Sequence, residues 1–233
     1  MTDPAIVLRD LAFEWAAGHP VLDVPSFCVE RGERVFLHGP SGSGKSSLLG
    51  VIGGVLVPRT GTIRLLGTDL PALSPSRRDH FRADHVGFIF QMFNLLPYLS
   101  VVDNVTLAAR FSARRRQRAG DLRGEARRLL RALGMDRPSL LGRPVTRLSI
   151  GQQQRVAAAR ALFGRPDVLI ADEPTSSLDA DTRESFLSLL MQESAAAGTT
   201  LLFVSHDRSL GRLFDRCVAL DDINRARPDR EAA

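Results

Sequence analysis

The chain has 233 residues, enough to bury the core of one large domain or of a domain with an inserted lobe. Hydrophobic residues make up 44% of it and charged residues 24%, the proportions of an ordinary soluble globular protein. No apolar run approaches the roughly 18 residues that span a bilayer, and the N-terminus lacks the basic and apolar regions of a signal peptide. We therefore expect a cytosolic protein that takes part in membrane processes only through a partner.

The net charge is +5, and arginine supplies every basic residue except Lys45. We attribute the arginine richness to codon composition, so charge alone gives no reason to expect nucleic-acid binding. The single lysine is more informative, because it places a compact ammonium on a flexible stem at one position only. Cys28 and Cys217 are too few for a disulfide framework, and we expect both to be small buried hydrophobic residues.

The first 52 residues alternate strand-like runs with turns. Residues 6–15 mix β-forming side chains with alternation, residues 18–20 form a turn, and residues 27–30 form a second, short strand. An apolar run at residues 34–38 then leads through a Gly/Ser-rich turn into a helix-compatible segment at residues 45–52. This order predicts a strand–loop–helix unit.

The middle of the chain changes from strands to helices. Strands are expected at residues 62–66 and 86–90. Between them, Ser74 and Pro75 form a helix start, with serine as the cap and proline at the first helical position. Helical patterns rich in arginine and alanine follow at residues 101–110, 122–133 and 151–163.

Strand character returns after this helical stretch. Residues 167–171 and 199–205 are apolar runs bounded by polar turns, as buried parallel strands are. A helix at residues 180–196 lies between them. The whole order predicts an α/β domain with parallel strands, interrupted by a helical lobe.

One basic run lies within the helical stretch, at residues 114–118, where four of the five residues are arginine. We expect a solvated, poorly ordered connection there. The alternative is a contact with anionic lipid headgroups at a membrane surface.

Residues 39–46 fit the phosphate-loop pattern GxxxxGK[ST] between a strand and a helix. The glycines let the backbone curl so that its N–H groups point at phosphate oxygens, and the helix N-terminus adds a favourable field. Lys45 is expected to reach the β- and γ-phosphates, and the Ser46 hydroxyl is expected to bind Mg²⁺. The residues expected to hold the nucleotide here are Gly39, Pro40, Ser41, Gly42, Ser43, Gly44, Lys45, Ser46 and Ser47.

A second motif follows the buried run at residues 168–171, which ends in the adjacent carboxylates Asp172 and Glu173. Asp172 suits the second shell of Mg²⁺, and Glu173 suits polarisation of an attacking water. The pair separates metal binding from general-base work, which one carboxylate could not do at once. Together with the phosphate loop, it indicates a nucleotide hydrolase.

The remaining motifs indicate which kind of hydrolase this is. Residues 148–152, Leu-Ser-Ile-Gly-Gln, closely resemble the LSGGQ signature of ABC ATPases. Gln91 stands where that family has its Q-loop glutamine, and His206 stands where it has its switch histidine. Residues 177–179 match the D-loop, and Trp15 stands about where the family places an aromatic ring against adenine.

The resemblance covers nearly the whole chain. It implies an α/β fold: a P-loop (RecA-like) core with a parallel sheet, an N-terminal antiparallel β subdomain and an inserted helical subdomain. The core would comprise residues 1–93 and 163–233, and the helical subdomain residues 94–162. It also implies ATP and Mg²⁺ as ligands, catalysis by Glu173, His206 and Gln91, metal binding by Ser46, Gln91 and Asp172, and nucleotide binding by Trp15, Ser149, Gly151, Gln152 and Asp179.

In the resembled family, the helix start at Ser149 faces the γ-phosphate held by another copy, so two copies pair head to tail around two ATP molecules. Ile150 is a departure, because the family usually has glycine there. A β-branched residue resists positive φ, so we expect Ile150 to be helical or extended, its side chain turned from the nucleotide. The tail is a second departure, since residues 221–224 lack the usual last strand. We expect loss of this tail to leave the site unaffected.

Residues 88–97 resemble the Q-loop segment of the lipoprotein-release and macrolide-export group of ABC ATPases. This implies an integral-membrane permease as partner, at the cytoplasmic side of the inner or plasma membrane. A cell-division-type complex, which signals across the membrane without transport, is the alternative function. A DNA- or ribosome-linked ABC ATPase is disfavoured, because the chain has neither a long coiled-coil insertion nor a second cassette. The apolar residues that would receive a permease helix, or else pack under the helical lobe, are Met92, Phe93, Leu95, Leu96 and Tyr98.

Overall fold

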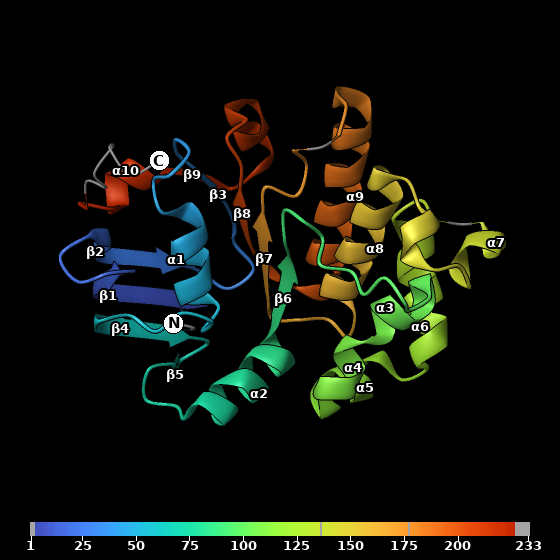
Figure 1. The fold of residues 1–233 in the computed structure, drawn as a ribbon, viewed down its shortest axis with the longest axis horizontal. Coiled ribbons are helices and arrows are strands. Elements are labelled where there is room, and N and C mark those ends of the chain that lie inside the picture. The colour runs from blue at the N-terminus through green and yellow to red at the C-terminus, as the bar shows by residue number, and fades with distance from the viewer. Residues whose placement is uncertain (1–2, 136, 177, 227–233) are drawn as a thin grey trace. The chain divides into compact units, whose positions relative to one another are not determined.

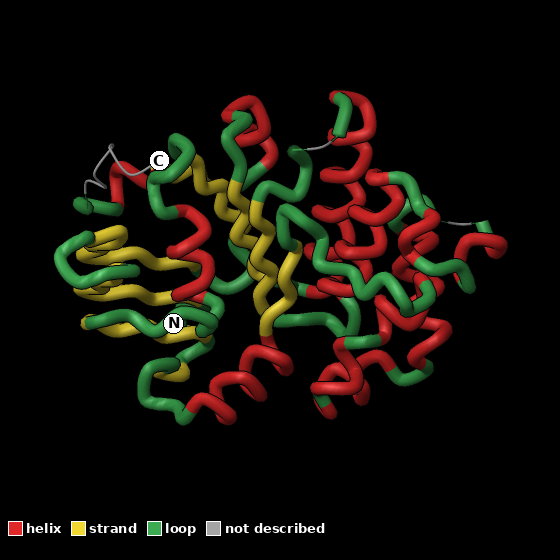
Figure 2. The backbone as a smooth tube through the Cα atoms, in the orientation of Figure 1, coloured by secondary structure: helices red, strands yellow, loops and turns green. Residues whose placement is uncertain are grey.

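The computed structural model describes residues 3–135, 137–176 and 178–226 of the chain. These residues form two compact units, which we call unit 1 and unit 2. Unit 1 holds the residues up to Arg82 together with those from Thr200 onward, and unit 2 holds Ala83–Thr199. Figures 1 and 2 show strands in both units, with most of the helices in unit 2.

An antiparallel sheet of unit 1 has the strand order β2-β1-β4-β5. Alternate side chains of β1 are buried at Ile6 and Leu8, and the buried set shifts to Leu11 and Phe13 because the register breaks around Asp10, whose φ is 48°. The strands are β1 Ile6–Glu14, β2 Pro20–Val29, β4 Thr60–Leu65 and β5 Thr68–Asp69. This is the antiparallel subdomain that the resemblance implied.

The second strand is longer than expected. Residues 18–20 were expected to form a turn and residues 27–30 a short strand, whereas β2 begins at Pro20. Proline is tolerated there because β2 lies at the edge of the sheet, with one neighbouring strand only. The turn is present at residues 17–18, so the expectation was wrong in where the strand begins.

Unit 1 also contains parallel strands, with β3 Arg34–His38 between β8 Thr200–Val204 and β9 Arg216–Ala219. The rings of Phe36, Phe203 and Phe214 pack together, with centroids 5.1–6.1 Å apart. These apolar side chains bury the strands, as the solid apolar runs predicted. The helical elements of this part of the chain are α1 Lys45–Ile52, α2 Pro75–His85, η2 Arg208–Leu213 and α10 Leu220–Ile223.

The C-terminal tail follows β9 as the short helix α10, and no further strand follows it within the described residues. Leu220 is fully buried, and its Cβ lies 3.3 Å from where a Cβ on Gly39 would be. The Asn224 side chain accepts a bond from the Asp23 N–H (2.8 Å) and donates one to the Val21 carbonyl (3.0 Å). The tail therefore packs against β2, which borders the phosphate loop. That its loss leaves the site unaffected stays a prediction.

Unit 2 is built on the parallel pair β6 Val86–Ile89 and β7 Val168–Asp172. Its longest helices, α8 Ile150–Leu162 and α9 Ala180–Ala197, pack against each other (Figure 1). The helix expected over residues 101–110 is divided at Leu107, whereas the other expected helices and strands of this unit agree with the structure within two residues. The remaining helices are α3 Val101–Thr106, α4 Ala108–Phe111, α5 Ala113–Ala119, α6 Leu122–Ala132, α7 Pro138–Leu141 and η1 Val145–Arg147.

The arginine run at residues 114–118 is not a solvated connection, because it forms α5 and its arginines bond within unit 2. Arg115 is 3% exposed and donates to the carbonyls of Ala161, Phe163 and Val86, while burial lowers its pKa to about 10. Of its neighbours, Arg114 and Arg118 pair with Asp167, and Arg116 donates to Ala109. The lipid interpretation loses its motivation as well, since these guanidinium groups already have partners.

Two further expectations concern the surface. Cys28 is half-buried and Cys217 is exposed, so neither is the fully buried hydrophobic residue that we expected. Within the described residues, none of the helices combines the length and the apolar character needed to cross a bilayer.

Candidate functional site

The phosphate loop of unit 1 connects β3 to α1, as the sequence predicts. Gly42 and Gly44 have φ of 76° and 98°, which only glycine adopts without strain. A Cβ on Gly44 would lie 3.1 Å from the Val21 carbonyl oxygen, so β2 packs directly against the start of α1. The loop thus has the left-handed turns and the close backbone packing that a phosphate cradle requires.

Lys45, the first residue of α1, turns back over this loop. Its Nζ donates to the carbonyls of Gly39 (2.9 Å) and Pro40 (2.7 Å). The ammonium is therefore held on the loop side of the helix start, where the helix dipole also favours negative charge. Ser43 is 7% exposed, and its hydroxyl has no hydrogen-bond partner within the described part of the chain. A buried hydroxyl without a protein partner in the same loop is suited to a phosphate oxygen.

Trp15 and Ser47 are brought together at the edge of this loop. The Trp15 ring is 67% exposed and packs edge-on against Phe13, with centroids 5.1 Å apart. Its Nε1 donates to the hydroxyl of Ser47, in the first turn of α1, at 3.3 Å. This bond fixes an exposed aromatic face next to the helix start, where an adenine ring could stack.

His206 lies at the same end of the unit 1 strands as the phosphate loop. β3 and β8 run parallel, with Leu37 opposite Val204. Gly39 comes two residues after Leu37, and His206 comes two residues after Val204. The Ser205 N–H donates to the Leu37 carbonyl (3.2 Å), which extends the pairing toward His206. The imidazole is exposed at this edge.

Unit 2 brings Gln91, Asp172 and Glu173 to one edge of its strands. Ile89 lies opposite Ala171 in the parallel pair. Gln91 comes two residues after Ile89, and Glu173 comes two residues after Ala171, so both lie beyond the same end of the pair. Glu173 has φ of 45°, an uncommon left-handed conformation for a residue with a side chain. Such strain is found where the surrounding structure fixes a side chain for function.

The signature segment begins α8 with a reciprocal cap. The Ser149 hydroxyl accepts from the Gln152 N–H (3.3 Å), and the Gln152 side chain accepts from the Ser149 N–H (3.1 Å). This capping box defines a helix start whose first N–H groups have no acceptor within the helix. Ile150 is the first helical residue and is 57% exposed. The prediction of a helical backbone at Ile150 is confirmed, and positive φ is not required there. Its side chain lines the same pocket as Ser149 and Gly151, so the expectation that it turns away from the site stays a prediction.

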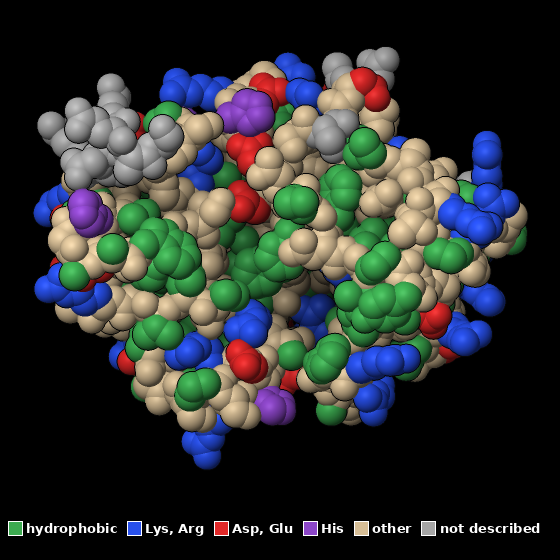
Figure 3. Space-filling model, viewed as in Figure 1, with side chains coloured by type: hydrophobic (Ala, Val, Ile, Leu, Met, Phe, Trp, Pro, Cys, Tyr) green, Lys and Arg blue, Asp and Glu red, His purple; other side chains and the backbone are tan. Residues whose placement is uncertain are grey.

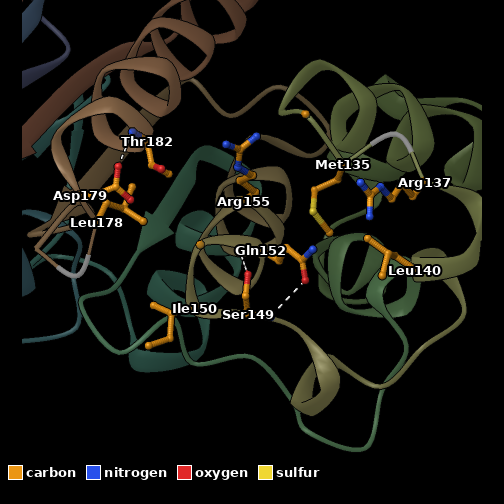
Figure 4. A pocket seen from close by; sticks show the side chains of 12 residues that line it. Met135, Arg137, Leu140, Ser149, Ile150, Gln152, Arg155, Leu178, Asp179 and Thr182 are labelled. Atoms are coloured by element: carbon orange, nitrogen blue, oxygen red, sulfur yellow. Dashed lines mark hydrogen bonds between the residues drawn. The ribbon is translucent and has the colours of Figure 1, made fainter.

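The same helix start borders an open pocket of about 600 Å³ in unit 2 (Figure 4). Ser149, Gly151 and Gln152 line it, and so does Asp179, the cap of α9. Asp179 accepts a bond from the Thr182 N–H (3.0 Å), drawn in Figure 4. The signature and D-loop motifs therefore meet in one pocket, although Ser177 of the D-loop lies outside the described residues.

Charge gathers on the signature side of the chain. Residues 94–162 hold 14 arginines and only four acidic residues. Figure 3 shows Lys and Arg side chains gathered over the part of unit 2 that carries α6 and α7. Codon composition explains a preference for arginine over lysine but not the shortage of acidic residues, so this segment carries an excess of positive charge.

The apolar residues after Gln91 differ in exposure. Met92 is 84% and Tyr98 77% exposed, whereas Phe93, Leu95 and Leu96 are half-buried. Both alternatives given for this segment therefore describe part of it. Met92 and Tyr98 are free for a partner, and the other three contact their own unit.

Sequence reasoning missed two side chains of α8 that bind these loops. Gln154 is fully buried and donates to the Pro174 carbonyl, next to Glu173. Arg160 donates to the carbonyls of Phe93 and Asn94, in the loop after Gln91. Their partners lie 20 and 66–67 residues away in the chain, so no local pattern marked them.

The donor set suits magnesium nucleotide. Ser46, Gln91 and Asp172 offer hydroxyl, amide and carboxylate oxygens, the hard ligands that Mg²⁺ prefers. The described residues contain no group of three or more His, Cys, Asp and Glu that could hold a metal. Mg²⁺ commonly takes one or two protein oxygens together with substrate phosphates, and each of these three residues offers an oxygen of the kind it prefers.

Comparisons with known proteins agree with these motifs. The model of the family described as ABC transporter matches residues 22–176. The lipoprotein-releasing system ATP-binding protein LolD 2 of Caulobacter vibrioides is 40% identical over 225 residues, 95% of this chain and 96% of that protein. The macrolide export ATP-binding/permease protein MacB of Rhodopirellula baltica is 39% identical over 203 residues, 87% of this chain but 29% of that protein.

A solved structure shows the same fold. The dimeric post-hydrolysis state of the ATP-binding cassette MJ0796, bound to ADP and Pi, matches with a TM-score of 0.85 and 31% identity over 97% of both chains. The expected cassette fold and the resemblance to the lipoprotein-release and macrolide-export group are confirmed.

Proposed function

Because the chain belongs to the ABC transporter family and is an ATPase cassette of that family, we propose that it drives a membrane permease as a head-to-tail pair. Each copy holds one ATP molecule in its phosphate loop and covers the other copy's ATP with its signature helix. The permease belongs to the lipoprotein-release or macrolide-export type. The pair is peripheral and lies on the cytoplasmic side of the membrane.

The observation that carries this proposal is the capped start of α8 in a pocket that also holds Asp179. A helix start with a serine hydroxyl and free N–H groups is an anion site. The phosphate loop around Lys45 already supplies an anion site for the nucleotide that the same copy holds. A chain with both kinds of site is suited to bridge nucleotides in a symmetric pair, and the basic charge of residues 94–162 supports the same arrangement.

The residues divide the work of hydrolysis. Lys45 neutralises the β- and γ-phosphates. Ser46, Gln91 and Asp172 would hold Mg²⁺, which would supply further positive charge to the phosphates. Glu173 takes the proton of the attacking water, and His206 contacts the γ-phosphate from the end of β8. Loss of the γ-phosphate removes the charge that joins the copies, so the pair opens.

Two inactive variants test the head-to-tail pair. Lys45→Ala and Ser149→Glu are each expected to abolish ATPase activity alone. In a mixture, each mixed pair keeps one intact site, made from Lys45 of one copy and Ser149 of the other. About a quarter of the wild-type activity should return, since random mixing makes half of the pairs mixed. If the mixture stays inactive while both variants remain folded by circular dichroism, the head-to-tail pair is wrong.

A second experiment tests the permease partner. Met92→Asp places a charge on an exposed apolar residue, so it should abolish co-purification with a permease while the cassette stays folded. Phe111→Asp is the matched control, because Phe111 is 67% exposed on α4. Equal recovery of the permease by both variants would place the partner elsewhere. The permease recovered with the wild type also separates an exporter or extractor from a cell-division-type complex.

A further inference from the structure

The loop that follows Gln91 has an uncommon backbone. Phe93 and Asn94 have φ of 56° and 47°, a conformation that residues with side chains rarely adopt in succession. Local bonds run from the Phe93 N–H to the Phe90 carbonyl (3.0 Å) and from the Asn94 N–H to the Met92 carbonyl (2.6 Å). These bonds use neither the Phe93 nor the Asn94 carbonyl, so the turn needs support from another element.

Arg160, in the last turn of α8, gives that support. One of its terminal nitrogens donates to the Asn94 carbonyl and the other to the Phe93 carbonyl, each at 2.6 Å. The planar guanidinium fork can bind two consecutive carbonyls only when the turn holds them side by side. The contact therefore depends on the backbone conformation of the loop and not on the identity of its side chains.

The surroundings of Arg160 disfavour its positive charge, because they remove part of the water around the guanidinium group. Burial lowers its pKa, and no carboxylate is among the groups that shift it. By contrast, Arg128 on α6 is paired with Glu125 and Glu193. Arg160 is half-buried and has no ion-pair partner among the residues that the structure describes, so its charge depends on the dipoles of these carbonyls for stabilisation.

The helix that carries Arg160 also carries the signature serine. α8 runs for 13 residues from the Ser149 cap, a rigid element of about 20 Å. Near its middle, Gln154 donates to the Pro174 carbonyl, directly after Glu173. One helix thus binds the loop of the general base, the turn after Gln91 and, at its start, the pocket shared with Asp179.

We propose that Arg160 is a positioning residue that holds the turn after Gln91 in its hydrolytic conformation and ties that turn to the helix beginning at Ser149. The inference rests on the proposed function, because it assigns Gln91 and Ser149 to the two ATP sites. A displacement of α8 at a nucleotide moves the Gln91 turn with it. Arg160 touches neither nucleotide nor metal.

A series at one position tests the contact. Arg160→Gln should lower kcat for ATP hydrolysis about tenfold or more, the effect of losing one charge-assisted hydrogen bond. Arg160→Lys should fall between Arg160→Gln and the wild type, because an ammonium lacks the planar fork. Arg116→Gln is the matched control, since Arg116 binds the Ala109 carbonyl in the same unit and should change kcat less than about twofold.

A double-mutant cycle distinguishes positioning from simple stability. If Arg160 acts through Gln91, then Arg160→Gln added to Gln91→Ala should lower kcat by less than about twofold. Equal losses in the two backgrounds would overturn the proposal, and so would an Arg160→Gln protein with wild-type kcat. The cycle is repeated with Arg160→Lys, which keeps a cation in the site if Arg160→Gln does not fold.

Hydrogen exchange gives a readout that does not depend on ATPase activity. Amides of residues 92–96 should exchange faster in Arg160→Gln than in the wild type, and those of the phosphate loop should not. Unchanged exchange at 92–96 would overturn the positioning role even if activity fell. A wild-type protein that does not hydrolyse ATP, with faster exchange in the variant, would instead contradict the proposed function and leave the contact standing.

Discussion

The C-terminal tail gives a direct test of how the phosphate loop is supported. Asn224 is 8% exposed, and its side chain bonds to the backbone of Asp23 and Val21 on β2. The Val21 carbonyl in turn lies against Gly44 of the phosphate loop. Asn224→Ala removes both of these bonds to β2, together with the bond that the Asn224 Oδ1 accepts from the Ala226 N–H inside the tail (3.2 Å).

The size of the effect follows from the exposure of the strand. A hydrogen bond between protein groups contributes about 1 kcal/mol net, so two bonds set an upper value of about 2 kcal/mol. β2 is the edge strand of its sheet, so water can replace part of what Asn224 provides. We therefore expect Asn224→Ala to lower the free energy of unfolding by about 1–2 kcal/mol.

Urea unfolding measures this change as a lower midpoint at an unchanged slope. Asn224→Asp keeps an oxygen for the Asp23 N–H but sets a carboxylate oxygen against the Val21 carbonyl oxygen, so it should lower the free energy of unfolding at least as much as Asn224→Ala. Binding of an ATP analogue should weaken in the same order, because Val21 loses its anchor beside Gly44. If Asn224→Ala unfolds within about 0.5 kcal/mol of the wild type, the usual scatter of surface substitutions, the tail does not support the loop.

Two further predictions concern unit 2. Ile150 already has helical backbone at the first position of α8, so Ile150→Gly should raise ATPase activity less than about tenfold; a larger rise would show that the side chain crowds the site. Burial raises the pKa of Asp167, but the bond from His85 and the charges of Arg118 and Arg114 outweigh this and hold that pKa well below its usual value. A carboxyl with a depressed folded-state pKa stabilises the protein above its unfolded pKa of about 3.9 and loses that effect as the pH falls. Asp167→Asn should therefore cost about 2 kcal/mol at pH 7, measured by urea unfolding, and progressively less below about pH 4; a difference independent of pH would contradict this.

The sequence predicts the motifs of this chain because each is local. The phosphate loop needs glycine at positive φ between a strand and a helix, and residues 39–46 show all three features. The Ser149 cap and the Gln152 that returns its bond are three residues apart, within reach of a pattern search. The same holds for the start of α2 at Pro75, because serine precedes it.

The features that the sequence does not predict depend on distant partners. The run at residues 114–118 looks solvated until Asp167, about 50 residues away, supplies its carboxylate. Asn224 bonds to residues more than 200 positions earlier, and Arg160 to a loop 66 positions earlier. The sequence does not reveal these partners, because every residue has a backbone carbonyl. Any residue type can therefore accept such a bond.

This preference for backbone carbonyls also gives the arginine content a physical meaning. Arg115 satisfies three carbonyls, Arg116 places two nitrogens on one, and Arg160 divides two nitrogens between two. An ammonium has the same charge but no rigid fork, so lysine at these positions would lose part of each contact. Codon composition alone therefore does not explain why arginine is used there. The role proposed for Lys45 differs, since a flexible stem would let one point charge move from the loop carbonyls to a phosphate, and this is the one place where the chain has lysine.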